Sequence, residues 1–154
     1  MKKVFASLLL LVGGLCFVTG CGNQNVEGTL EELMTKVYAD LSDDQKPMGL
    51  TNMEVNEENV AVFLGTEDIK YIEALASESM VGSIAHSVVL VRVEDSEVED
   101  VKKEIEENIN PRKWICVGVE EEDVIIKNKG NLIAVILVVD EQTRTILEKG
   151  FDNL

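Results

Sequence analysis

Cysteine, histidine and proline are scarce in this chain of 154 residues, which contains three cysteines, one histidine and two prolines. Cys16 and Cys21 lie near the amino terminus, so only Cys116 remains in the body of the sequence and no internal disulfide can form there. The one histidine, His86, belongs to no zinc signature. The body of the chain must therefore be stabilised by packing.

Basic residues are also few, because 14 Lys and Arg stand against 29 Asp and Glu and give a formal net charge of −15. Without residues 1–20 the chain would keep 12 basic and 29 acidic residues over 134 positions, a charge of −17. Such a field repels phosphate backbones and anionic lipid headgroups. Nucleic acid is therefore not an expected partner.

The first 21 residues have the layout of a signal for export. Two lysines precede an uncharged apolar run, 4–18, which is shorter than the roughly 20 residues that a transmembrane helix needs. The run ends in Val18-Thr19-Gly20-Cys21, which resembles the bacterial lipobox, where the cysteine is lipidated and becomes the new amino terminus. The alternative is an ordinary signal peptide cleaved near Gly20, with Cys21 left as a free thiol.

Lipidation of Cys21 would place the protein at the extracytoplasmic face of the cell membrane. Two acyl chains, such as palmitate, anchor a protein stably, whereas one chain holds it only marginally. The sequence thus predicts a signal peptide over 1–20, a lipidated cysteine with a polar spacer over 21–28, and a single domain over 29–154.

The rest of the chain alternates helical and strand patterns in the order α-α-β-β-α-β-β-α. This order predicts an α+β fold, with about four mostly antiparallel strands packed with helices. Segment 42–51 is expected to be a loop. The first expected elements are a helix opened by a capping box at Thr29–Glu32, a short helix from Asn56 to a left-handed Gly65, a strand over 69–76, for which a helix is the alternative, and a strand over 84–93. They are followed by a helix from a capping box at Ser96–Glu99 to Pro111, a hairpin of 124–127 and 132–139, and a helix from Asp140 to a left-handed stop at Gly150.

Two long segments carry a resemblance to a known family. They are SIAHSVVLVRVEDSEVEDVKKEIEENI, residues 83–109, and NPRKWICVGVEEEDVIIKNKGNLIAVILV, residues 110–138. Together with the lipobox and the first helix, they resemble a domain-of-unknown-function family of small lipoproteins from Clostridia-like Gram-positive bacteria. The resemblance implies the compartment and no activity.

His86 and Cys116 are the residues that most invite a catalytic interpretation. His86 could act as a base beside a carboxylate, yet no nucleophile motif accompanies it, and we expect a hydrogen-bonded structural histidine. Cys116 lies between Ile115 and Val117 in a strongly acidic chain, which disfavours the thiolate, so we expect a buried, inert thiol. No catalytic residue is assigned.

Arg112, Lys113 and Trp114 form the only basic and aromatic group and are the candidate ligand-binding residues. The alternative is that Trp114 packs into the core while the two cations pair with nearby acids. The acidic runs 94–100 and 120–123 lack the spacing of a calcium loop, so we predict no metal site and no cofactor. The sequence favours a noncatalytic binding or accessory module, with an envelope protein or a small ligand as partner; a small hydrolase-like enzyme using His86 is the alternative.

Overall fold

The computed structural model describes residues 25–154, so the predicted signal peptide and Cys21 lie outside the described part. Nine helices and strands follow in the order α-β-α-β-β-α-β-β-α, with short 3₁₀ turns at Asp95–Glu97 and Glu121–Asp123. The elements are α1 (Leu30–Val37), β1 (Leu50–Glu54), α2 (Val60–Leu64), β2 (Glu73–Ser79), β3 (His86–Arg92), α3 (Val98–Asn108), β4 (Ile125–Lys129), β5 (Leu132–Val138) and α4 (Glu141–Asp152).

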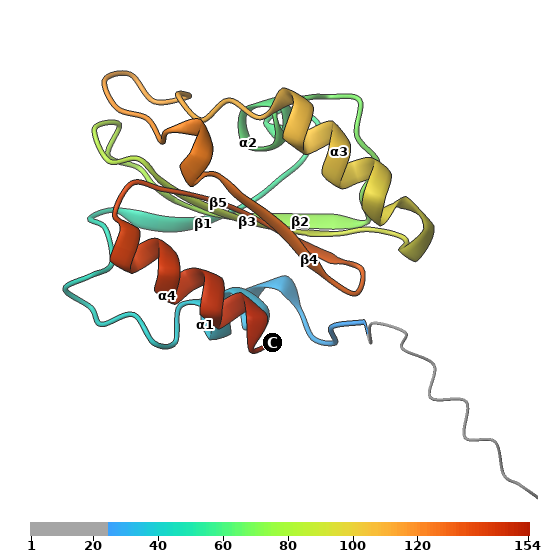
Figure 1. Cartoon of the computed structure of the whole chain (residues 1–154), viewed down its shortest axis with the longest axis horizontal. Coiled ribbons are helices and arrows are strands. Elements are labelled where there is room, and N and C mark those ends of the chain that lie inside the picture. The colour runs from blue at the N-terminus through green and yellow to red at the C-terminus, as the bar shows by residue number, and fades with distance from the viewer. Residues whose placement is uncertain (1–24) are drawn as a thin grey trace, which may run out of the picture.

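One five-stranded sheet, ordered β1-β2-β3-β5-β4 and antiparallel throughout, separates two layers of helices. Helices α1 and α4 cover one face, and α2 and α3 cover the other (Figure 1). Strand β3 serves both cores: Val88 and Leu90 pack with the α1/α4 layer, and Val89 and Val91 pack with the α2/α3 layer. Because both faces are covered, β3 is apolar on both, as predicted for a central strand.

Strand β1 is the element that the sequence did not predict, since it occupies part of the expected loop 42–51 and raises the strand number to five. Its side chains are exposed or half-buried because it lies at the edge of the sheet. An edge strand such as Leu50–Glu54 therefore shows little of the alternation that identifies a half-buried strand. Its partner β2 spans Glu73–Ser79, later than the predicted 69–76.

Three predicted helix signals are confirmed. Thr29 and Glu32 form the capping box of α1, and the carboxylate of Asp140 accepts a hydrogen bond from the Thr143 amide at 2.7 Å. Gly65 ends α2 in the left-handed conformation, with φ of 86°. Short-range signals at these ends were sufficient because their hydrogen bonds join residues close in sequence.

Two other predicted signals are wrong. The box at Ser96–Glu99 does not form, because a 3₁₀ turn occupies Asp95–Glu97 and α3 begins at Val98 with no side-chain cap. Gly150 is no stop, since α4 continues to Asp152. A Cβ at Gly150 would collide with the backbone of Val37, so this glycine allows α4 to lie close to α1.

The two ends of β3 mark the two ends of the molecule. At one end, the Arg92 guanidinium donates to the carbonyls of Val26 at 2.6 Å and Gly28 at 2.7 Å, so the start of the described chain is held there. His86 lies at the other end of the strand, roughly 20 Å away at about 3.4 Å per residue. We call these the Arg92 end and the His86 end of the sheet.

Candidate functional site

Lys113 lies in a buried polar cluster, not on the surface. Its Nζ donates to Glu78 at 2.5 Å and to Ser87 Oγ at 3.2 Å, and its side chain is 6% exposed. The ammonium also lies 4.5 Å from the centre of the Phe63 ring. Burial lowers the pKa of Lys113, and the contact with Glu78 opposes that shift. The cluster joins β2, β3 and the segment after α3 on the α2/α3 face of the sheet.

The other two candidate ligand-binding residues do not share an exposed surface with Lys113. One guanidinium nitrogen of Arg112, Nη2, donates to both carboxylate oxygens of Glu120, at 2.8 and 2.9 Å. Trp114 is partly buried against the α2/α3 core, and its Nε1 has no hydrogen-bond partner among the described residues. The structure thus distributes the three residues between the core and an ion pair on the surface.

Cys116 is exposed, so the prediction of a buried thiol is wrong. Residues 111–119 form a closed loop that adds no strand to the sheet, and its ends are joined by a 2.8 Å bond from the Val119 amide to the Pro111 carbonyl. Inside this 111–119 loop, Lys113 turns inward while Ile115, 90% exposed, turns outward. The apolar sequence around Cys116 was misleading because it makes a loop, in which Val117 and Val119 pack against the α2/α3 core while Ile115 and Cys116 face outward.

His86 is buried, and its Nε2 lies 2.8 Å from the hydroxyl of Tyr38, which confirms the prediction of a hydrogen-bonded structural histidine. Desolvation lowers the pKa of His86 to about 4 and raises that of Tyr38. Its hydrogen-bond partner is therefore a phenol, whereas the enzyme alternative requires a carboxylate.

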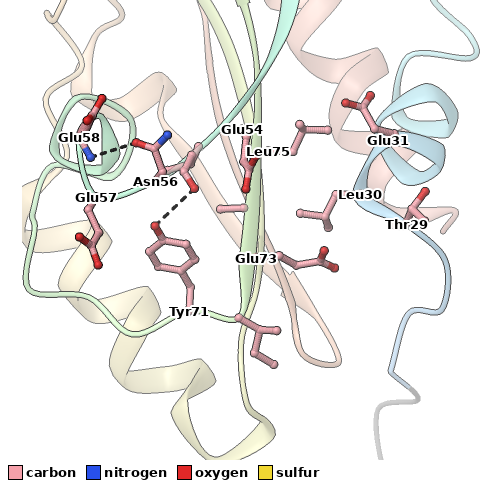
Figure 2. A pocket seen from close by; sticks show the side chains of 13 residues that line it. Thr29, Leu30, Glu31, Glu54, Asn56, Glu57, Glu58, Tyr71, Glu73 and Leu75 are labelled. Atoms are coloured by element: carbon pink, nitrogen blue, oxygen red, sulfur yellow. Dashed lines mark hydrogen bonds between the residues drawn. The ribbon is translucent and has the colours of Figure 1, made fainter.

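A groove of about 820 Å³ opens at the Arg92 end, where β1 stops beside β2. Figure 2 shows that the groove passes around the edge of the sheet, with Leu30, Glu31 and Glu73 on the α1 side of the strands and Tyr71 and Glu57 on the other side. Part of the lining of the groove consists of apolar side chains. The 13 residues that line the groove are Thr29, Leu30, Glu31, Glu54, Val55, Asn56, Glu57, Glu58, Tyr71, Ile72, Glu73, Ala74 and Leu75.

The groove has a negative lining, with five glutamates and one carboxamide among its polar side chains and no Lys or Arg. Glu73 pairs with Arg92 at 2.7 Å, and Glu31 accepts a bond from Asn52 at 2.7 Å. Glu54, Glu57 and Glu58 have no side-chain ion pair among residues 25–154. Burial and the charges of Glu57 and Glu54 raise the pKa of Tyr71. The groove can accept a positive group beside an aromatic ring.

Sequence reasoning missed this groove because its walls are distant in sequence. The one available signal was local, since Glu54, Glu57 and Glu58 fall within five residues of each other. Their connection to Glu31 and Glu73 depends on the pairing of β1 with β2, and β1 was not predicted.

The two acidic runs considered for calcium are partly used in ion pairs. Glu97 lies 3.7 Å from Lys70, Glu120 pairs with Arg112, and Asp123 pairs with Arg144 at 2.6 Å. Across residues 25–154, no group of three or more His, Cys, Asp or Glu has an arrangement that could hold a metal ion.

The lipidation site predicted at Cys21 lies outside the described residues. Within 25–154, no helix has the length and apolar character needed to cross a membrane. The described part does include the end of the predicted spacer, where Val26 is buried in the α1/α4 core. The domain packing therefore begins before Thr29.

Residues 25–154 thus form a single small α+β domain, with a five-stranded antiparallel sheet, four helices and an acidic groove. No protein family matches the chain, and no solved structure matches it.

Proposed function

We propose that the protein is a lipid-anchored extracytoplasmic lipoprotein and acts as a noncatalytic binding module for a positively charged ligand. The single observation that carries the binding part is the acidic groove beside β1 and β2. The anchoring part rests on the lipobox that ends at Cys21 and on the resemblance to small Gram-positive lipoproteins.

The chemistry of the groove favours a ligand with several amino groups, such as a lysine-bearing segment. Glu54, Glu57 and Glu58 supply negative charge that no described cation neutralises, and Tyr71 supplies a ring that can contact an ammonium group. Leu30, Leu75 and Ile72 add apolar surface for the methylene stems of lysine. An anionic ligand would be repelled by the negative charge of the groove.

Titration of the mature lipoprotein in detergent micelles with a pentalysine peptide tests this proposal. The double variant Glu54→Gln/Glu57→Gln should weaken binding about tenfold, a change of about 1.4 kcal/mol. The control Glu122→Gln/Glu141→Gln removes the same charge from exposed positions outside the groove and should change binding by less than about twofold.

The comparison of the two double variants separates a site from general attraction. Overall acidity acts equally in both variants because each loses two negative charges. Equal affinity of the two variants, or no binding by the unaltered protein at low salt, would refute the groove as the binding site.

A further inference from the structure

Four exposed apolar side chains gather at the His86 end of the sheet. Met80 follows β2 and donates its amide to the carbonyl of Gly49, which places it beside Met48. Gly82 lies next to Ile115 of the 111–119 loop, and Val139 donates its amide to the Ala85 carbonyl. Figure 1 shows the loops that carry them together on the left, opposite the start of the described chain. Met48, Met80, Ile115 and Val139, exposed by 76, 64, 90 and 54%, are the apolar tip.

The apolar tip is held in shape before any contact is made. The 111–119 loop is closed at its base by the bond between Val119 and Pro111, and Lys113 attaches it to Glu78. Gly118 lies against Arg112 and has no room for a Cβ. Because these contacts fix the loop backbone, little conformational entropy is lost when Ile115 is covered.

The tip is also the part of this acidic chain with the fewest carboxylates. Segments 45–50, 79–86 and 109–119 contain no Asp or Glu, although the chain has 29. Their only charged residues are Lys46, Arg112 and Lys113, each paired with an acid. Asp43, Asp44, Glu120 and Asp140 flank the tip.

We propose that the apolar tip docks the same tip of a second copy of this chain. A two-fold symmetric contact covers both sets of apolar side chains and places the two acidic bodies on opposite sides. Approach by surfaces that are rich in carboxylates brings like charges together, which costs free energy. An anionic membrane is a poorer occupant, because the flanking acids and the charge of −17 on the mature chain oppose it.

The contact is small, so membrane anchoring would make it effective. Four side chains are fewer than the 20 to 30 residues per side of a standard interface, and we expect weak association in free solution. Anchoring on one membrane raises the effective concentration of the two copies. This step rests on the proposed lipid anchor, whereas the tip lies at the opposite end of the sheet from the groove and does not depend on ligand binding.

Oxidative crosslinking of the full-length protein in its own membranes tests the contact, with the exposed Cys116 as reporter beside Ile115. An added thiol oxidant takes two electrons from two Cys116 thiols, and two protons leave as one S–S bond forms. The native chain should give a product of twice the chain mass, and Cys116→Ser should abolish it. Met80→Asp should lower its yield at least tenfold, because the contact would then cover a charged carboxylate in each copy.

Val62→Asp is the matched control, since Val62 is 56% exposed on α2 and also gains one negative charge. Its yield should equal that of the native chain, after correction for the rate at which each Cys116 reacts with a neutral maleimide. Equal yields for Met80→Asp and Val62→Asp would overturn the proposal. So would a native chain that gives no crosslinked product, or one whose product differs from twice the chain mass.

Discussion

The hydroxyl of Tyr38, just after α1, lies 2.8 Å from Nε2 of His86, at the start of β3. This contact joins two elements that are 48 residues apart and fills a polar position in the α1/α4 core. Because both groups are buried, neither can exchange its partner for water without local opening.

This contact predicts a loss of stability in mild acid. Burial lowers the pKa of His86 from 6.5 to about 4, so the unfolded chain binds a proton more readily than the folded chain between these values. The contribution of His86 is therefore complete above pH 6.5 and is lost as the pH falls towards 4, by up to about 3 kcal/mol. The free energy of unfolding, determined in urea at pH 7 and at pH 5, measures this loss of stability.

The control for this prediction is Tyr38→Phe/His86→Leu, which removes both polar partners and avoids leaving one unpaired. Other groups that change protonation between pH 7 and pH 5 are present in both proteins and affect both alike. The unaltered chain should lose more free energy of unfolding from pH 7 to pH 5 than the double variant. Identical pH profiles would show that His86 is not a buried neutral base.

Removal of the Lys113 ammonium should strongly destabilise the fold. Lys113→Met leaves Glu78, whose side chain is 13% exposed, without its cation, and breaking a buried pair in this way costs about 3 to 5 kcal/mol. Lys103→Met, at an exposed ion pair with Glu107, should cost less than about 1 kcal/mol. Urea denaturation compares the two. A similar small cost for both would contradict a structural role for the Lys113 cluster.

Gly150→Ala should destabilise the packing of α4 on α1. The added methyl group would collide with the backbone around Val37, and the resulting shift should cost about 1 to 3 kcal/mol, more than alanine gains in helix propensity. Gly82→Ala meets nothing closer than Ile115 at 4.0 Å and should change stability by a few tenths of a kcal/mol. Thermal unfolding of both variants checks the difference. A more stable Gly150→Ala protein would contradict the close approach.

Arg92→Met should release the segment that precedes α1. Arg92 supplies three bonds at its end of the sheet, to Val26, Gly28 and Glu73, and methionine keeps its apolar stem but none of the donors. Limited proteolysis should therefore cut between residues 25 and 29 several-fold faster, with mass spectrometry to locate the cleavage. Arg112→Met, which loses a pair on the surface, should leave that rate unchanged.

Cys21→Ser should separate the protein from the membrane. Without the thiol no diacylglyceryl group can be attached, and the acidic domain offers no other attraction to anionic lipids. Fractionation of cells should find the variant in the soluble or secreted fraction, or as an unprocessed precursor of higher mass. Cys16→Ser serves as the control and should stay anchored. A Cys21→Ser protein that is processed and fully membrane-bound would refute the predicted anchor.

The sequence alone determined the features that depend on near neighbours. The α+β class, the central β3, the cap at Thr29 and the stop at Gly65 follow from side-chain spacing and from hydrogen bonds within a few residues. The buried stripe of α3, including Val101 and Ile105, follows from helical periodicity. These features require no knowledge of what packs against them.

The tertiary structure decided the features that join distant segments. Strand β1 exists because Leu50–Glu54 pairs with β2, and this pairing places Glu54 opposite Leu75 in the groove. Lys113 is buried because its ammonium group donates hydrogen bonds to Glu78 and Ser87 of the sheet, and Ile115 and Cys116 therefore lie at the surface. Gly150 lies within α4, where the absence of a Cβ allows the helix to approach the backbone of Val37. In each case the contact that decides the structure is made with a residue distant in sequence, so no local sequence pattern reveals it.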